Sequence, residues 1–122
     1  MGLTFRKEER LHSKIIIQEL FVKGSSFYLY PFKVLFMEGA AETPFNQVLF
    51  TVSKRNFKRA VDRNKLKRRM REAFRLNKSQ LSPSQKLAIG YIYTPKQMLP
   101  YPQIEEAMIK SIKRLTNYEK KD

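Results

Sequence analysis

The sequence predicts one α/β domain over residues 1–122, a two-layer sandwich in which helices pack on a small mixed sheet. First, 42% of the 122 residues are hydrophobic, which allows a buried core without metal or disulfide support. Second, stretches with strand alternation and stretches with helical spacing follow in the order helix, strand, strand, helix, strand, helix. Third, no repeat, low-complexity tract or long linker interrupts them, so a single domain is expected.

The first helix is expected over residues 13–23, where Ser13 suits the N-cap and Gly24 suits the residue that ends the helix. The apolar side chains form two adjoining rows at a spacing of four residues, Ile16 with Leu20 and Ile17 with Phe21. Three consecutive isoleucines also fit a strand, so that alternative stays open.

Two strands are expected next, over residues 27–37 and 47–53, joined through residues 38–46 into an antiparallel hairpin. Pro31 marks an edge position, a bulge or a break in the first strand. Only one face of this strand can pack under the helices, so the other is free to line a cleft. Alternation assigns the two faces as Phe32, Val34 and Phe36 on one side, and Leu35 and Met37 on the other.

A third strand is expected over residues 86–93, with Gly90 as a possible bulge, after a turn-forming stretch over residues 81–84. A final helix is expected from about Gln103 to Tyr118, with Pro102 at its first position. The apolar row of this helix recurs at steps of four, four and three: Ile104, Met108, Ile112 and Leu115.

The segment between the second and third strands is the most basic part of the chain. The chain carries a net charge of +14, of which residues 54–75 contribute +9, and the other 100 residues contribute only +5. At 100° per residue, a helix here has one apolar stripe, made of Leu66, Met70, Ala73 and Phe74. The adjoining arc is polar and almost entirely cationic: Arg63, Asn64, Lys67, Arg68, Arg71 and Arg75.

A solvated helix face is the ordinary explanation of a charge run. Here, however, five cations share one arc without a carboxylate among them, and they repel one another unless a polyanion neutralises them. Arginine at four of the five positions favours forked contacts to phosphate oxygens. We therefore expect nucleic acid as the partner, with Asp62 and Glu72 forming ion pairs inside the basic cluster.

The absence of cysteine excludes disulfides and thiolate metal sites, and it agrees with a reducing compartment. No apolar run approaches the roughly 20 residues of a membrane helix. The N-terminal stretch is charged and lacks the apolar centre of a secretory signal. The expected location is the cytoplasm, with neither a membrane nor a protein partner.

One motif inside the basic helix is a basic–Asn–basic triplet followed by spaced cations: Arg63, Asn64 and Lys65, then Lys67, Arg68 and Arg71. It resembles the hallmark of the bacterial ribonuclease P protein subunit, where Arg-Asn-Arg is followed by spaced basic residues on a helix. Lys65 departs from that pattern, and a point-charge contact would replace a forked one there. The stretch Val52–Arg55 matches the family's strand end and turn, and Phe21 and Gly24 match the end of its first helix. The resemblance covers residues 10–77 well, and the C-terminal third only by element order and size.

The resemblance implies an α/β fold like the second domain of a small-subunit ribosomal protein, with a left-handed strand–helix–strand crossover. The general rule alone would predict a right-handed one. The family forms a ribonucleoprotein endonuclease with a catalytic RNA, which removes the 5′ leader of precursor tRNA by Mg²⁺-dependent hydrolysis. The resemblance therefore implies two RNA partners, the catalytic RNA and precursor tRNA, with Mg²⁺ held mainly by the RNA.

The resemblance also implies roles for individual residues. The basic helix would meet the catalytic RNA through Arg63, Asn64, Lys65, Lys67, Arg68, Arg71 and Arg75. A cleft between the first helix and the sheet would hold the leader, with contacts from Phe21, Phe36, Ser53, Lys54 and Arg55. An aromatic residue on a strand is more often part of a core, so that alternative stays open for Phe36.

No catalytic or metal-binding residue is expected in the protein. Hydrolysis of RNA needs an acid–base pair or metal-binding carboxylates, whereas this chain has one histidine, His12, and its eleven carboxylates lie mostly at the termini and helix ends. Three alternatives remain: a ribosomal or RNA-chaperone protein that uses the same basic helix, a stand-alone nuclease, and a peripheral membrane protein.

Overall fold

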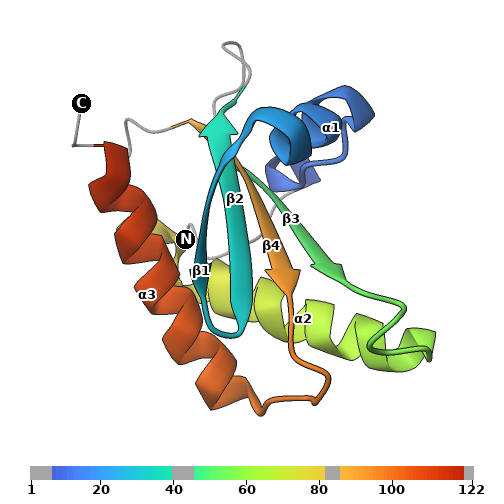
Figure 1. Ribbon diagram of the computed structural model, residues 1–122. Helices are drawn as coiled ribbons and strands as arrows, with labels where there is room; N and C mark the ends of the chain where they lie inside the picture. The colour runs from blue at the N-terminus through green and yellow to red at the C-terminus, as the bar shows by residue number, and fades with distance from the viewer. Residues whose placement is uncertain (1–6, 40–45, 82–85, 120–122) are drawn as a thin grey trace.

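The structure is a computed structural model that describes residues 7–39, 46–81 and 86–119. A four-stranded mixed sheet in the order β1-β2-β4-β3 forms its centre (Figure 1). β1 and β4 pair with β2 in the antiparallel sense, whereas β3 and β4 run parallel. The elements in chain order are η1 (Lys7–Glu9), α1 (Lys14–Lys23), β1 (Ser25–Leu29), β2 (Phe32–Glu38), β3 (Gln47–Val52), α2 (Ala60–Asn77), η2 (Lys78–Gln80), β4 (Leu87–Tyr93) and α3 (Tyr101–Glu119).

The hairpin differs from the one that the sequence predicts. The expected first strand is two strands, β1 and β2, which turn at a cis Tyr30–Pro31 peptide bond and pair with each other. β3 is not the neighbour of β2, because β4 lies between them. The predicted antiparallel hairpin between residues 27–37 and residues 47–53 is therefore wrong. Pro31 is the break that its position allowed.

β3, α2 and β4 form a strand–helix–strand unit with parallel strands. In Figure 1 the arrows of β3 and β4 both point down, β3 lies to the right of β4, and α2 passes behind the sheet. The chain therefore turns in the left-handed sense from β3 to β4. This is the handedness that the family resemblance implies, against the usual right-handed rule.

The main core lies between one face of the sheet and the layer formed by α2 and α3, which confirms the expected sandwich. Tyr91 sits at its centre, stacked on Phe50 with ring centroids 5.7 Å apart and edge-on to Phe32 at 5.3 Å. Its hydroxyl group hydrogen-bonds Ser111 Oγ on α3 at 2.7 Å, which satisfies both buried polar groups. Burial raises the pKa of Tyr91, so the phenol stays neutral.

α1 packs on the opposite face of the sheet through the fully buried Leu20. Two glycines make room for this side chain. A Cβ atom at Gly90 would lie 3.2 Å from Leu20 Cδ2, and a Cβ at Gly24 would lie 3.0 Å from Leu20 Cδ1. Gly90 pairs in regular register with Leu35 and Leu49, so it is no bulge, and its role is the close approach of α1.

The helix ends follow the expected rules in part. Ser13 caps α1 by accepting a hydrogen bond from the Ile16 N–H, and the helix interpretation of the isoleucine run is confirmed. Gly24 ends α1 in an extended conformation, with φ −68°, and not in the left-handed one typical of a glycine stop. α3 begins one residue earlier than Pro102 would require as its first position. No helix within the described residues is long and apolar enough to cross a membrane.

Candidate RNA-binding surfaces

The position of α2 is determined by its apolar stripe. All four predicted stripe residues, Leu66, Met70, Ala73 and Phe74, are at most 1% exposed. The Phe74 ring packs edge-on to Phe50 of β3, with centroids 6.0 Å apart. Because the stripe is buried against the sheet and α3, the remaining faces of α2 are held in one orientation toward solvent.

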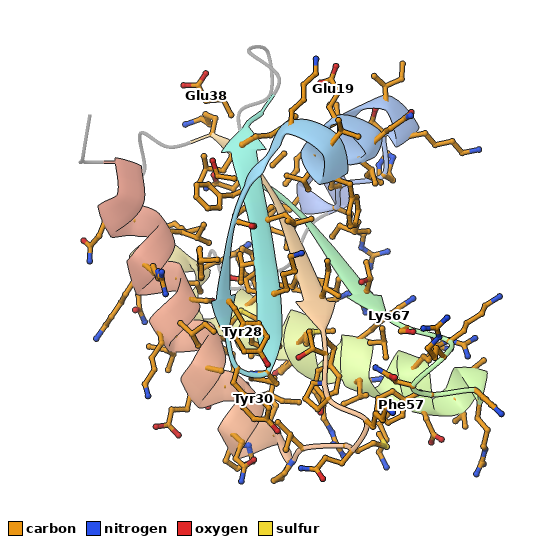
Figure 2. The ribbon with its side chains drawn as sticks, in the orientation of Figure 1. Glu19, Tyr28, Tyr30, Glu38, Phe57 and Lys67 are labelled. Atoms are coloured by element: carbon orange, nitrogen blue, oxygen red, sulfur yellow. The ribbon has the colours of Figure 1, made fainter. Side chains whose placement is uncertain are left out.

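The predicted RNA-binding residues of α2 differ in how far they reach into solvent. Asn64, Lys65 and Arg68 are exposed, whereas Arg63, Lys67, Arg71 and Arg75 are half-buried. We call these seven residues the cationic face of α2. Figure 2 shows Lys67 beside the end of β3, as expected for a residue that borders the apolar stripe.

Two arginines of the cationic face also have structural roles. Arg63 donates hydrogen bonds from Nη1 to the carbonyl oxygens of Phe57 and Lys58, both at 2.9 Å, and so ties down the loop that precedes α2. Arg75 pairs with Glu72 at 2.6 Å, and the hydrogen bond from Arg75 lowers the pKa of the Glu72 carboxyl. The ion pair expected for Glu72 is confirmed. Asp62 forms none with any residue that the structure describes.

Arg10, which the sequence interpretation missed, joins the cationic face. The residue forms a parallel bridge with Val48 at the edge of β3, and the N–H of the following Leu11 donates to the Val48 carbonyl oxygen. Burial lowers the pKa of Arg71, and the charges of Arg10 and Arg68 lower it further. Three guanidinium groups therefore repel one another here, and the buried Nε of Arg71 has no hydrogen-bond acceptor among the described residues. A phosphate group beside these guanidinium groups would supply the missing negative charge.

The N-terminal segment is held against α2 by an ion pair. Lys78, directly after α2, binds Glu9 of η1 at 2.6 Å, and both side chains are largely buried. This contact holds η1 and the following Arg10 near the cationic face. The link joins residues 69 positions apart in the chain, so no local sequence pattern indicates it.

The turn between β3 and α2 adds further positive charge. Lys54 and Arg55 are exposed there, and Ser53 Oγ accepts the N–H of Arg55 at 3.0 Å. The Phe57 N–H in turn donates to the Ser53 carbonyl oxygen, so the turn is compact. The three predicted contact residues of this turn therefore lie together between the sheet and α2.

The sheet face that carries α1 is only partly covered. α1 packs over one end, near Leu35 and Ala88, and Figure 1 shows the other half of β2, β4 and β3 without a helix in front of it. One row of paired residues crosses all four strands in this uncovered half: Tyr28, Lys33, Ile92 and Thr51. We call this row the open sheet face. Each member is exposed or half-buried, and Figure 2 shows Tyr28 near the turn between β1 and β2.

The two predicted leader-stacking residues have different positions. Phe21 on α1 is 49% exposed and lies one turn after Ile17, which packs on the same side of the sheet as the open sheet face. Phe36 is 5% exposed and belongs to the main core on the opposite face, where it contacts Phe27. The assignment of Phe36 to a cleft with Phe21 is therefore wrong, and its alternative as a core residue holds.

The open sheet face ends close to the cationic face. Thr51 is the penultimate residue of β3, and Ser53, Lys54 and Arg55 follow it into the turn before α2. An extended anion on the open sheet face would therefore continue past this turn toward α2. Within the described residues, no three histidine or carboxylate side chains come together as metal ligands, and His12 is exposed.

Comparison with known proteins agrees with this geometry. The family model for ribonuclease P matches residues 5–116. The ribonuclease P protein component of Porphyromonas gingivalis is 33% identical over 115 residues, which cover 89% of this chain and 84% of that protein. The corresponding protein of Petrotoga mobilis is 29% identical over 121 residues, covering 93% and 97% of the two chains.

Solved structures show the same fold. The ribonuclease P protein of Thermotoga maritima superimposes with a TM-score of 0.74 at 27% identity, covering 87% of this chain and 96% of that one. The ribonuclease P protein of Staphylococcus aureus gives a TM-score of 0.73 at 26% identity, covering 88% and 94%. From the family match, the relatives and the shared fold, we conclude that this chain belongs to the ribonuclease P protein component family, which implies a role in tRNA 5′ processing as part of an RNA-based endonuclease.

Proposed function

We propose that this protein binds the catalytic RNA of ribonuclease P through the cationic face of α2 and binds the 5′ leader of precursor tRNA along the open sheet face. The observation that carries the proposal is the crowding of Arg10, Arg68 and Arg71 at the edge of β3, where no carboxylate of the described residues pairs with them. Such crowding is unfavourable in the free protein, and RNA phosphates relieve it on binding.

The cationic face acts through charge and orientation. Arg68 is exposed for a forked contact to phosphate oxygens, whereas Lys65 offers a point charge where relatives with Arg would offer a fork. The buried stripe holds the side chains in a fixed register, so little backbone ordering is needed when RNA binds. Phosphate contacts of this kind position the RNA without reading its sequence.

The open sheet face suits a single strand. Neighbouring strands lie about 4.8 Å apart, so the row from Tyr28 to Thr51 spans roughly 14 Å. Tyr28 and Phe21 offer rings for base stacking, and Lys33 lies in the middle of the row for a phosphate. Ser53, Lys54 and Arg55 extend the positive charge toward α2.

The chemical step belongs to the RNA in this proposal. Mg²⁺ held mainly by the catalytic RNA would activate the water that cleaves the phosphodiester bond. The protein holds the leader and neutralises phosphates near the cleavage site, so that less Mg²⁺ is needed to bring two polyanions together. We place this assembly in the cytoplasm.

A reconstituted cleavage assay tests the proposal. The purified protein is mixed with a ribonuclease P RNA and a precursor tRNA that carries a 5′ leader, at a low Mg²⁺ concentration. We expect cleavage at the mature 5′ end only when protein and RNA are both present. Equal cleavage without the protein would contradict the proposal, as would cleavage by the protein alone, which is the result expected of a nuclease.

A further inference from the structure

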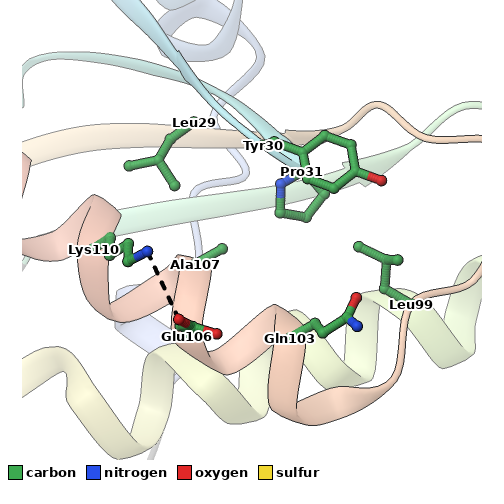
Figure 3. A pocket seen from close by; sticks show the side chains of 8 residues that line it. All are labelled: Leu29, Tyr30, Pro31, Leu99, Gln103, Glu106, Ala107 and Lys110. Atoms are coloured by element: carbon green, nitrogen blue, oxygen red, sulfur yellow. Dashed lines mark ion pairs between the residues drawn. The ribbon is translucent and has the colours of Figure 1, made fainter.

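A pocket of about 220 Å³ lies between the β1–β2 turn and α3 (Figure 3). Its apolar surface comes from Leu29, Pro31, Leu99 and Ala107. Leu29 packs against the main core, so the pocket is on the opposite side of the sheet from the open sheet face. Neither of the two proposed RNA surfaces uses these residues.

Two polar side chains complete the pocket. Figure 3 shows the Tyr30 ring beside Pro31 on one side of the space and Gln103 of α3 on the other. Tyr30 is 53% exposed, and Gln103 is exposed as well. At the rim, Lys110 and Glu106 pair at 3.7 Å, so their charges largely cancel. The pocket therefore offers an aromatic ring, an apolar floor and one amide group with donors and an acceptor.

Hydrogen bonds between distant parts of the chain hold the pocket in shape. The N–H and hydroxyl groups of Thr94 both donate to the Pro31 carbonyl oxygen at 3.0 Å, which fixes the turn. The Tyr93 hydroxyl accepts the Leu99 N–H at 2.9 Å and donates to the Gln97 carbonyl oxygen at 2.7 Å. A ligand would therefore enter a preformed site, at little cost in ordering.

The pocket is joined directly to α2. Arg69 donates from Nη1 to the carbonyl oxygen of Leu99, a pocket residue, at 2.8 Å. Arg69 follows Arg68 of the cationic face, and Lys65 lies one helical turn before it. A base of an RNA held along the cationic face would have to extend past Arg69 toward α3 to reach the pocket.

The size and chemistry of the pocket limit its ligand. Drug-sized ligands occupy pockets of about 300–1,000 Å³, so this space suits one planar ring system. Proteins recognise unpaired RNA bases by stacking them on aromatic rings and by hydrogen bonds to their polar edges. Tyr30 and Gln103 provide these two contacts across an apolar space.

We propose that this pocket binds one unpaired nucleobase of the RNA that α2 holds, with the base stacked on Tyr30 and its edge bonded to Gln103. This inference rests on the proposed function for the identity of the RNA. It adds a base contact to a surface that otherwise contacts only phosphates. The pocket is separate from the open sheet face, so the leader is not its ligand.

Titration of the intact protein with single nucleotides tests the pocket directly. The probes are the four ribonucleoside 5′-monophosphates, and ribose 5-phosphate serves as the control without a base. We expect the nucleotides to shift the NMR signals of the Gln103 side-chain amide, and ribose 5-phosphate to leave them unchanged. Tyr30→Ala should weaken nucleotide binding by roughly 5- to 150-fold, the range expected for loss of one base stack. Ile15→Ala, which truncates a side chain 72% exposed on α1, should have no effect.

Binding of the catalytic RNA gives a second readout. Tyr30→Ala should lower the affinity without changing its dependence on salt, because a base stack neutralises no phosphate. If Tyr30→Ala fails to fold, the same RNA affinity is measured for Gln103→Ala, with Gln18→Ala as its control. Shifts at Gln103 with ribose 5-phosphate would overturn the proposal, as would no shift with any of the four nucleotides. If cleavage of precursor tRNA is then normal, the pocket proposal fails and the proposed function stands.

Discussion

The two faces of the sheet use the same four strands for opposite purposes. On one face, Phe32, Phe50 and Tyr91 are at most 7% exposed beneath α2 and α3. On the other, Lys33 is exposed and Ile92 and Thr51 are half-buried in the same three strands. Strand alternation separates the two sets of side chains, and the helices decide which set is covered.

Helix length and position explain the difference. α2 and α3 contain 18 and 19 residues and cover their face together, whereas α1 has 10 residues and covers one end of the other face. The closed face is built from aromatic and β-branched residues that fill space. The face that carries α1 has the small residues Gly90 and Ala88 beneath this helix. Where α1 does not cover it, this face has longer side chains that are polar or half-exposed. A short helix on a wide sheet therefore leaves a binding surface.

The largest effect that separates the two faces is expected from Phe74→Ala. This side chain is 1% exposed and packs against Phe50 and Tyr91, so its loss leaves a cavity and should cost about 3–5 kcal/mol of unfolding free energy. Thr51→Ala on the open sheet face should change the free energy of unfolding by less than about 0.5 kcal/mol. Urea denaturation of both variants makes the measurement. Equal losses would show that both faces are closed in solution.

Gly90→Val tests how α1 approaches the open side. Valine is favoured in strands, so strand propensity alone would stabilise the variant. The valine side chain would, however, collide with Leu20, whose Cδ2 is 3.2 Å from a Cβ at this position. We expect a net loss of about 1–3 kcal/mol by denaturation. In a Leu20→Ala background the loss should largely disappear. A loss of the same size in both backgrounds would show that Gly90 is needed for another reason.

The helices and the core were predictable because their signals are local. The period of the apolar residues in α2 was enough to place its four buried apolar side chains, though not the buried Asn77, and strand alternation separated Phe36 from Leu35. The strand order was not predictable in the same way, because β4 inserts between β2 and β3 through pairs more than 35 residues apart. The pairing of β1 with β2 was missed because Pro31 is compatible with a bulge or an edge as well as with a turn.

The site was predictable where it lies on one helix and not where it depends on tertiary contacts. Arg68 and Lys65 are exposed as the helical period requires. Arg10 reaches the cationic face through the bridge to Val48, and no pattern around Arg10 indicates this. Phe36 was assigned to the wrong face because alternation distinguishes two faces but does not say which one the long helices cover.

Arg10→Ala tests the tertiary extension of the cationic face, with Arg68→Ala as the variant that the helix alone predicts. Each should weaken binding of the catalytic RNA about fivefold at 0.15 M salt and lower the salt slope by about 0.7–0.9, the effect of one phosphate contact. Filter binding at several salt concentrations makes the measurement. Lys113→Ala removes an exposed cation from α3 and should change neither the affinity for the catalytic RNA nor the salt slope. An unchanged slope in Arg10→Ala would remove Arg10 from the RNA-binding surface.

Lys33→Ala tests the open sheet face and is expected to have the smallest effect. One contact to a single-stranded phosphate contributes about 0.7 to the salt slope, so binding of precursor tRNA to the holoenzyme should weaken about fourfold at 0.15 M salt. Binding of mature tRNA, which lacks the leader, should not change. Stability should stay within about 0.5 kcal/mol, because Lys33 is exposed.

Lys14→Ala, an exposed lysine at the start of α1, is the matched control for this variant. If Lys33→Ala weakens precursor and mature tRNA equally, Lys33 contacts the tRNA body and the open sheet face is not the leader site. If only the precursor is affected, the salt slope separates two causes. A lower slope indicates a phosphate contact by Lys33, whereas an unchanged slope indicates that the side chain acts by positioning the neighbouring Tyr28 ring.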